Sequence, residues 1–504
     1  MKIIDGRNIA GGTQINTDIC IIGAGAAGIT IAREFVGTLQ QVCLIESGGL
    51  SFDSATQSLY EMNNIGHPQL EKKPSRNRYF GGTTNSWTGR CVPLASIDFE
   101  ARDWVPESGW PIQASDLDPY YEKAAPLFKL PEYHHINAEF WHKKNSYKDE
   151  QLFFNDRSFS PVVALRSRKP VNFGSAYLKT LKQAHNIQIY THTNVTAIEA
   201  SENVSQVKNI QLACLEGSQF TIQAKVFILA CGGLENPRLL LLSNQQHSKG
   251  LGNQNDTVGR YYMDHPKVEQ GMLLLHNPKF NAPLFFGQRI ANGTAQFGLR
   301  LSDHVQRQEK LLNHYVLLQP QFTKYGNKEA HGVNRASRMR YFYRKLSQSP
   351  LKPNYLLVRS FLEQIPNPDS RVTLGRKTDR LGLRQIELNW KINSQERANL
   401  HRFHEIFAHY LKRHQIGRLE HQFPADETEQ SPLFDAFHPM GTTRMSVNPT
   451  LGVVDRDCKV HGLRNLFIAG SSVFPTGGHA NPTLTIVALA IRLSTHIKNS
   501  YHDI

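Results

Sequence analysis

The stretch "TDICIIGAGAAGITIAREFVGTLQQVCLIESGG", residues 17–49, decides the fold of this 504-residue chain. Two short apolar runs, at 19–22 and 42–45, are typical of strands buried on both faces of a parallel sheet. Between them, apolar residues recur at helical spacing from about 26 to 38. The order strand, glycine turn, helix, strand predicts an α/β fold that begins with a right-handed βαβ unit.

The glycine turn has the spacing G-x-G-x-x-G, in the strand-to-helix context that a dinucleotide-binding turn requires. Gly23 permits the tight turn, Gly25 lets the backbone approach a pyrophosphate, and Gly28 lets the helix pack closely on the strand. Glu46 ends the second strand, where it is placed to accept hydrogen bonds from ribose hydroxyls. The pattern does not separate FAD from NAD. The residues predicted to bind the dinucleotide here are Gly23, Gly25, Ala26, Ala27, Gly28, Glu46 and Ser47.

Further strand-like runs recur far along the chain, at about 208–233 and 465–472, and residues 174–200 predict a helix followed by a strand. A helix is also expected from about Leu234, with Pro237 near its first turn. Strands so far apart predict one nucleotide-binding domain assembled from several pieces. The predicted domains are a dinucleotide-binding domain of residues 1–110, 175–265 and 431–504, and a substrate-binding domain of residues 111–174 and 266–430.

Composition excludes several classes of protein. The chain is 40% hydrophobic and 20% charged, and it lacks the run of roughly 18 or more apolar residues that a membrane-spanning helix needs. Its six cysteines show no C-x-x-C spacing, which predicts buried free thiols, and no cluster has metal-ligand spacing, so no metal is expected. The N-terminus carries no apolar signal segment, so the expected location is the cytoplasm.

The net charge of +14 is spread over the chain, and nucleic acid is not expected as a partner. The densest basic segment, "NRASRMRYFYRKLSQ" at 334–348, predicts a solvated surface helix with one packed face. Docking to a membrane surface or to a partner protein is the alternative for this segment.

Seven motifs in this order make the chain resemble a glucose–methanol–choline (GMC) oxidoreductase. Residues from about 270 to 430 carry no recognisable signature. The motifs are the 17–49 stretch, "NRYFGGTTNSWTGR" (77–90), "SGWPIQASDLDPYYEKA" (108–124), "LACGGLENPRLLLLS" (229–243), "VGRYYMDHP" (258–266), "FHPMGTTRM" (437–445) and "GSSVFPTGGHANPTLTIVALA" (470–490).

The resemblance implies a Rossmann-like FAD-binding domain interleaved with an α+β substrate-binding domain built on an antiparallel sheet. Members of the family oxidise alcohols with FAD. The resemblance adds these residues to the predicted FAD site: Gly81, Gly82, Thr83, Thr84, Asn85, Ser86, Trp87, Val195, Ala230, Gly232, Gly470, Ser471, Asn481, Pro482 and Thr483.

The family's first catalytic histidine matches His438, and its partner at the entrance to the last helix matches Asn481. A neutral histidine suits removal of a hydroxyl proton, and an amide orients the hydroxyl without competing for that proton. The helix from Pro482 offers a positive dipole end to the charge of a reduced flavin. The alternatives are a structural His438 in a turn, an Asn481 that only caps the helix, and His479 as the catalytic partner. His265, in the "MDHP" motif, is expected to be a structural or cofactor-shell residue.

Trp87 makes the chain similar to the sugar-oxidising branch of the family, including pyranose oxidases and sugar or glycoside dehydrogenases. Some of these bind FAD covalently through a histidine just before this tryptophan. Ser86 stands there in this chain, so non-covalent FAD is expected.

The expected reaction is oxidation of a CH–OH group in a sugar, glycoside or polyol. A sterol or aryl alcohol substrate is the nearer alternative, and a non-catalytic flavoprotein assembly subunit is the more distant one. Oxygen, a quinone, or a cytochrome or small subunit are all compatible electron acceptors. Membrane association is expected only through such a partner, which also leaves co-export to the periplasm as an alternative location.

Overall fold

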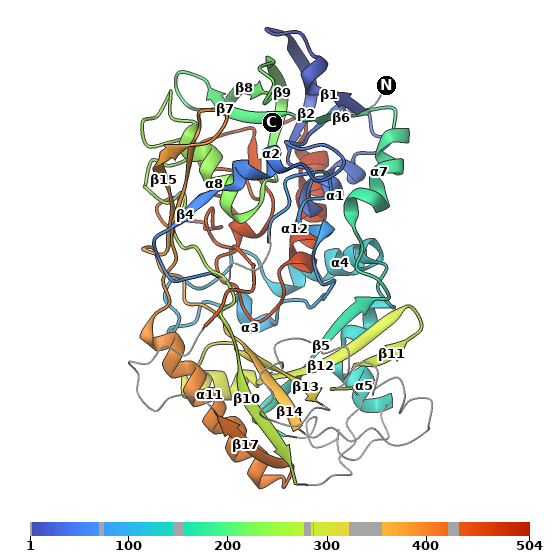
Figure 1. The fold of residues 1–504 in the computed structure, drawn as a ribbon, viewed down its shortest axis with the longest axis vertical. Helices are drawn as coiled ribbons and strands as arrows, with labels where there is room; N and C mark the ends of the chain where they lie inside the picture. Colours follow the sequence, from blue (N-terminus) through green and yellow to red (C-terminus); the bar gives the residue numbers. More distant parts are fainter. Residues whose placement is uncertain are drawn as a thin grey trace.

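The computed structural model describes residues 3–69, 75–144, 156–276, 284–285, 287–321, 355–421 and 433–504. The basic segment 334–348 therefore lies outside the described residues. The described part is elongated, with a mixed sheet and its helices at one end and a second sheet with a long helix at the other (Figure 1). Among the described helices, none is long and apolar enough to cross a lipid bilayer.

Eight strands form the first sheet: β1 (Ile3–Asp5), β2 (Gln14–Ile22), β3 (Val42–Ile45), β6 (Ile187–Thr191), β7 (Asn194–Ala200), β8 (Val207–Ala213), β9 (Gln219–Leu229) and β18 (Leu466–Ile468). Their order is β1-β6-β3-β2-β9-β8-β7, with β18 also beside β9. The pairings among β1, β6, β3, β2, β9 and β18 are parallel, whereas β8 runs antiparallel to both β7 and β9. Segments hundreds of residues apart in sequence thus share one sheet.

The predicted βαβ unit consists of β2, helix α1 (Ala26–Glu34) and β3. Gly23 has a φ of +105°, a left-handed conformation that favours glycine. A Cβ atom on Gly28 would lie 1.9 Å from the carbonyl oxygen of Gly23. The helix therefore packs on its strand at a distance that only glycine allows.

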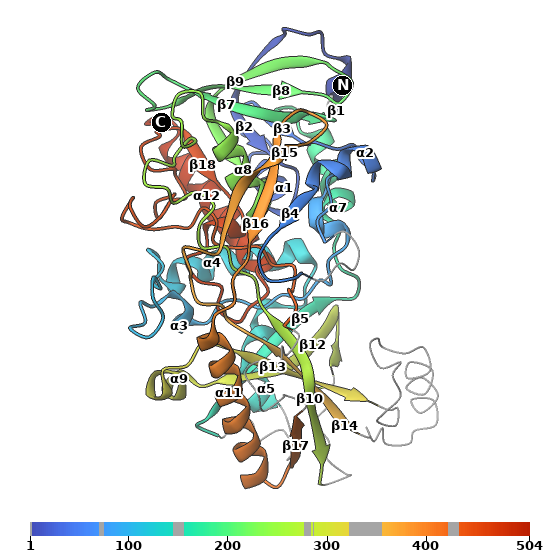
Figure 2. The same cartoon turned by 60° about the vertical axis from the view of Figure 1, so that its left-hand side comes forward.

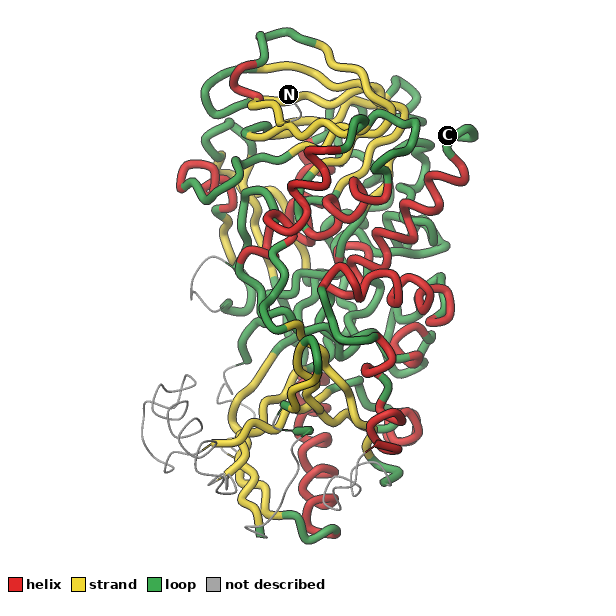
Figure 3. The backbone as a smooth tube through the Cα atoms, turned by 90° about the vertical axis from the view of Figure 1, so that its right-hand side faces the viewer, coloured by secondary structure: helices red, strands yellow, loops and turns green. Residues whose placement is uncertain are grey.

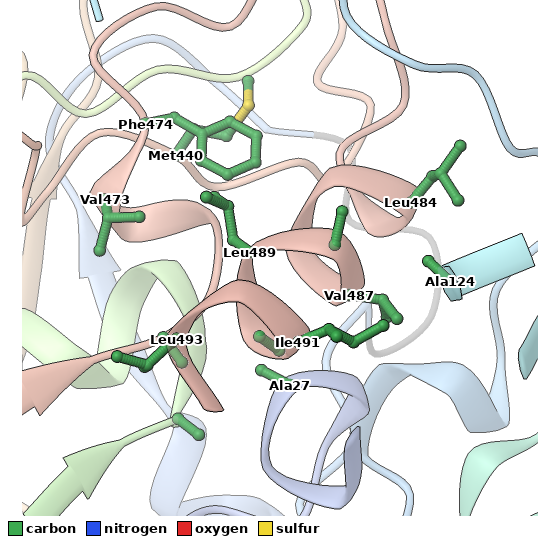
Figure 4. Packing of buried hydrophobic residues seen from close by; sticks show 14 of the residues in the cluster. Ala27, Ala124, Met440, Val473, Phe474, Leu484, Val487, Leu489, Ile491 and Leu493 are labelled. Atoms are coloured by element: carbon green, nitrogen blue, oxygen red, sulfur yellow. The ribbon is translucent and has the colours of Figure 1, made fainter. Parts of the chain in front are cut away.

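The remaining helices lie mainly between the two large sheets, as Figure 3 shows. They are α2 (Ser54–Gln57), α3 (Ser96–Phe99), α4 (Ala114–Ala124), α5 (Ala138–Lys144), α7 (Phe173–Gln183), α8 (Gly232–Leu242), α9 (Asp303–Glu309), α11 (Ser394–Arg413) and α12 (Thr483–Ser500). Helix α12 lies in the core between α1 and α4. In Figure 4, Val487 and Ile491 lie toward Ala27 and Ala124, whereas Leu489 lies toward Phe474.

Helix α8 begins earlier than the sequence predicts. It starts at Gly232, so Pro237 is its sixth residue and lies inside the helix, not in its first turn. Proline has no N–H to give to the carbonyl four residues before it, which is that of Gly233. The hydroxyl of Thr442 donates to this carbonyl at 2.6 Å. A side chain about 200 residues away therefore supplies the hydrogen bond that the proline removes.

The second large sheet is antiparallel in every pairing. Its strands are β5 (Phe159–Ser167), β10 (Lys267–Leu275), β11 (Gln288–Ile290), β12 (Gly293–Leu301), β13 (Tyr315–Gln321), β14 (Tyr355–Phe361) and β17 (Gly417–His421). One face packs on α11, where the ring of Phe159 contacts those of Phe403 and Phe407. This arrangement confirms the predicted fold class, an α/β dinucleotide-binding part with an antiparallel sheet in the second part.

A third, three-stranded sheet lies beside the first sheet in Figure 2 and consists of β4 (Met62–Asn64), β15 (Arg371–Thr378) and β16 (Arg384–Asn389). All strands of the first sheet fall in the residues predicted for the dinucleotide-binding domain, and those of the second in the residues predicted for the substrate-binding domain. Several contacts cross that division, among them the pairing of β16 with β4 and the packing of α4 on α12. The domain boundaries themselves stay a prediction.

Candidate active site

A cavity of about 500 Å³ lies at the carboxyl ends of β2, β3 and β9, where open α/β sheets bind their ligands. Distant parts of the chain supply its wall, among them the glycine turn, the Gly82–Trp87 turn, the His438 loop and the start of α12. The predicted site residues in the wall are Gly23, Gly25, Ala26, Ala27, Glu46, Ser47, Gly82, Thr83, Thr84, Ser86, Trp87, Val195, Ala230, Gly232, His438, Gly470, Ser471, Asn481, Pro482 and Thr483.

Three predicted cofactor-binding residues lie behind this wall and shape it. Gly28 packs α1 on β2, as described above. Gly81 donates its N–H to the carbonyl of Ala24 at 2.8 Å and has a φ of +98°. The amide of Asn85 donates to the carbonyl of Gly82 at 2.8 Å, so it closes the turn and does not enter the cavity wall.

Two places in the cavity wall suit the negatively charged groups of a dinucleotide cofactor. The N-termini of α1 and α12 both lie at the cavity, and neither has a side-chain cap on its free N–H groups. The positive ends of the two helix dipoles therefore suit a pyrophosphate and the charge of a reduced flavin ring. Glu46 accepts backbone N–H groups from Ala24 at 3.1 Å and Gly48 at 2.9 Å, which fixes its carboxylate at the end of β3. The other lone pair on each carboxylate oxygen can accept a hydrogen bond from a ribose hydroxyl.

His438 and Asn481 meet in the cavity wall. The Asn481 Nδ2 atom lies 3.3 Å from His438 Nε2, and an amide nitrogen only donates. The N-cap of α12 is Pro482 and carries no side-chain hydrogen bond. The Asn481 side chain thus contacts the histidine and leaves the helix end uncapped.

His265 lies behind His438 and determines which nitrogen of His438 carries hydrogen. His265 Nε2 lies 3.0 Å from the carbonyl oxygen of Gly478 and 3.2 Å from that of Gly477, so this nitrogen carries the hydrogen and donates. Its Nδ1 lies 3.0 Å from His438 Nδ1. With both rings neutral, His438 Nδ1 donates to His265 Nδ1, and His438 Nε2 keeps a lone pair toward Asn481 and the cavity.

Burial keeps both rings neutral. Burial lowers the pKa of His438 well below 6.5, and the positive charges of a protonated His265 and of Lys267 lower it further. Burial also lowers the pKa of His265, although its two carbonyl partners oppose that shift. Asp264 holds the two histidine loops together, because its carboxylate accepts the backbone N–H of His265 at 2.6 Å and that of His438 at 2.9 Å.

His479 does not belong to the cavity wall. Its ring is buried, with Nδ1 at 3.4 Å from Asp98 Oδ2 and 3.2 Å from Asn313 Nδ2. These contacts give His479 a structural place beside the site, whereas Asn481, two residues on, reaches the cavity.

Sequence reasoning missed several wall residues, among them Arg78, Arg90 and Phe437. All three stand inside or next to quoted motifs, so their position in the motifs was a usable signal. For Arg90 the signal was weak, because its contacts to Gln296 and Tyr315 cross more than 200 residues. The role of His265 in orienting His438 had no signal in the sequence.

The fold and the cavity together define the class of protein: an α/β dinucleotide-binding enzyme whose histidine–asparagine pair lies at the cofactor cavity. Models of the two domains of the GMC oxidoreductases match residues 162–267 and 366–490. The chain belongs to the GMC oxidoreductases and is an FAD-dependent oxidoreductase.

Several relatives extend over nearly the whole chain. It is 22% identical to the 2-methyl-1,2-propanediol dehydrogenase of Mycolicibacterium austroafricanum, over 97% of this chain and 96% of that protein. It is also 22% identical to the fructose dehydrogenase large subunit of Gluconobacter japonicus, over 96% of this chain and 98% of that protein. The crystal structure of a formate oxidase shares the fold, with a TM-score of 0.61 and 19% identity over 98% of this chain and 100% of that one.

Proposed function

We propose that this enzyme oxidises a CH–OH group of a sugar, glycoside or polyol to a carbonyl, with His438 as the base and Asn481 as the residue that orients the hydroxyl. The observation that carries the proposal is the 3.3 Å contact between Asn481 Nδ2 and His438 Nε2 in the cavity wall. FAD, which the wall fits, supplies the hydride acceptor when it is bound.

The chain's own part in this reaction is to position a hydroxyl and to take its proton. In the structure the lone pair of His438 Nε2 faces the Asn481 amide. A substrate hydroxyl that lies between the two side chains gives its proton to Nε2, while the Asn481 amide donates a hydrogen bond that holds the oxygen in place. The proton makes the His438 ring positive. His438 Nδ1–H then shares this charge with His265, whose own N–H faces two carbonyl oxygens.

Replacement of His438 by Ala tests the role of the base. We expect the rate of anaerobic flavin reduction, normalised to bound FAD, to fall by about 10²-fold or more, the loss typical of a missing general base. The matched control is His304→Ala, at an exposed position on α9, which should keep the wild-type rate. A wild-type rate in His438→Ala would remove this residue from the mechanism.

The substrate class rests on the names of relatives and on Trp87. Two relatives are named for a diol and for fructose, and Trp87 lies in the cavity wall with its indole N–H donated to the carbonyl of Val171 at 3.0 Å. A panel of sugars, glycosides, polyols, a sterol and an aryl alcohol should bleach the flavin bands only with the first three classes. Bleaching by the sterol or aryl alcohol alone would favour the alternative substrate class, and an unchanged spectrum with every alcohol would favour a non-catalytic subunit.

The acceptor that reoxidises the flavin belongs to the same proposal. Relatives include both dehydrogenases and oxidases, and one is named as a large subunit. Mixing the reduced enzyme with oxygen, a soluble quinone or cytochrome c separates the three expected acceptors by their reoxidation rates. We also propose that the enzyme is located in the cytoplasm. The alternative is export together with a partner subunit, and cell fractionation distinguishes the two locations.

A further inference from the structure

The second large sheet turns a cationic face toward the active-site cavity. Residues directly opposite each other in antiparallel strands share a face, and the register pairs Arg166 with Thr294, and Leu317 with both Gly298 and Arg359. Because side chains alternate along a strand, Arg166, Gln296, Tyr315 and Arg359 therefore lie on one face. The opposite face is the apolar one that packs on α11.

Arg90 joins this face to the cavity. It is a buried residue of the cavity wall. Its Nη1 donates to the Tyr315 hydroxyl at 3.1 Å and its Nη2 to Gln296 Oε1 at 2.8 Å. Both partners are neutral. A guanidinium has five N–H groups, so the fork of Arg90 retains donors for a ligand in the cavity.

Two further cations lie close to Arg90 and His438. Arg166 has a buried Nε with no hydrogen-bond partner in the described part of the chain, and burial, with the nearby charge of Arg90, lowers its pKa to about 10. The Lys267 ammonium lies 5.9 Å from the ring centre of Phe437, which lines the cavity next to His438. Within the described ranges, Arg90, Arg166 and Lys267 have no carboxylate at ion-pair distance.

A buried positive charge is costly without an anion beside it, and arginine binds carboxylates and phosphates through paired N–H groups. We propose that the alcohol substrate carries an oxyanion, a carboxylate or a phosphate, which Arg90 binds while Arg166 and Lys267 add positive potential. This inference rests on the proposed oxidation and narrows it to acidic sugars or polyols. The anion is held at the second sheet while the reacting hydroxyl lies at His438 and Asn481.

Matched substrate pairs test the inference in the holoenzyme. D-glucose is compared with D-glucuronate, which adds a carboxylate, and with D-glucose 6-phosphate, which adds a phosphate. We expect at least one anionic member to half-saturate flavin reduction at a concentration about tenfold or more below that of glucose, as expected for a charge-assisted hydrogen bond. The substrate with the lower half-saturating concentration shows whether the oxyanion is a carboxylate or a phosphate. Equal or weaker saturation by both anions would overturn the inference while leaving the alcohol oxidation intact.

Variants assign the effect to the arginines. Arg90→Gln should reduce the preference for the anionic member by about tenfold or more, and Arg166→Gln should reduce it by a smaller factor. The matched control is Arg168→Gln, at an exposed position directly after β5, where the guanidinium donates to the carbonyl of Ala291 at 2.8 Å. The preference of this variant for the anionic member should equal that of the wild type. If Arg90 had only a structural role, Arg90→Gln would change the half-saturating concentrations of glucose and of the anionic substrate by the same factor. This result would contradict the inference.

Binding provides a readout that does not depend on turnover. Calorimetric titration of the oxidised holoenzyme with glucuronate and with glucose 6-phosphate should show one of them binding, and Arg90→Gln should weaken that binding. Failure of every alcohol to bleach the flavin, with anion binding intact, would refute the proposed oxidation alone. Bleaching by glucose without any binding of the anions would refute only the oxyanion site.

Discussion

At the scale of single residues, the state of His438 depends on His265. The sequence places His438 in a motif but does not indicate which ring nitrogen faces the substrate. Two backbone carbonyls, of Gly477 and Gly478, decide this, because they force the hydrogen of His265 onto Nε2 and leave its Nδ1 to accept from His438. His265, expected from the sequence to be a structural or cofactor-shell residue, is therefore a positioning residue for the proposed base.

Replacement of His265 tests its role in positioning the hydrogen of His438. In His265→Leu the acceptor for His438 Nδ1–H is lost, so we expect flavin reduction to slow by about tenfold or more through loss of the productive tautomer. His265→Gln keeps both an acceptor and a donor and should recover part of the rate. Equal rates in the two variants, at equal FAD content and thermal stability, would show that His265 only fills space.

The pH dependence of flavin reduction follows from the same burial. The pKa of His438 lies well below 6.5, so the neutral base predominates above that lowered value and is lost only as the pH falls through it. We expect the limiting rate of flavin reduction in stopped-flow experiments to stay constant from neutral pH to below 6.5. A decline centred at 6.5 or above would indicate that His438 is more exposed to water or is not the base.

At the scale of elements, α8 shows how a tertiary contact overrides a local rule. Proline usually ends or starts a helix, so the sequence predicts Pro237 near the first turn. The helix instead begins at Gly232, five residues before Pro237, and Thr442 donates to the carbonyl that Pro237 leaves without its helical partner. The Thr442 side chain comes from the same motif as His438, so the contact also ties α8 to the active-site loop.

Thr442→Val should lower the free energy of unfolding by about 1–3 kcal/mol, because the carbonyl of Gly233 remains buried without the hydroxyl. Denaturant unfolding of the holoenzyme measures this loss. Thr442→Ser keeps the hydroxyl and should recover most of it. Thr450→Val, at an exposed position in the following turn, is the matched control and should be nearly neutral. Equal losses in the Val and Ser variants would refute the role of the hydrogen bond.

At the scale of the whole molecule, a buried ion pair connects the segment after α3 to the segment that follows β14 of the second large sheet. Arg102 Nη1 lies 2.9 Å from Glu363 Oε2, and both side chains are fully buried. Glu363 Oε2 also accepts the backbone N–H of Asn313 at 2.7 Å. The pair of Arg102 and Glu363 joins parts of the chain that sequence reasoning assigns to different domains.

Glu363→Gln should destabilise the protein by about 3–5 kcal/mol, because Arg102 remains as a buried charge without its anion. A matched comparison is available nearby. Arg307 and Glu100 form an exposed pair at 2.7 and 2.9 Å between α9 and the residue after α3. Glu100→Gln should cost less than about 1 kcal/mol in the same thermal or denaturant unfolding experiment. Similar losses in the two variants would contradict this distinction between buried and exposed pairs.

The sequence by itself determined the features that depend on neighbours in the chain. The apolar runs at 19–22 and 42–45 and the glycines between them dictate a βαβ unit, because helix and strand periods and glycine conformations are local properties. The motif resemblance identified the family. The tertiary structure alone decided the features that join distant segments: the hydrogen bonds that select the tautomer of His438, the hydroxyl that completes α8, and the strand register that brings Gln296 and Tyr315 together at Arg90. Such contacts depend on the relative positions of side chains hundreds of residues apart, which no local pattern specifies.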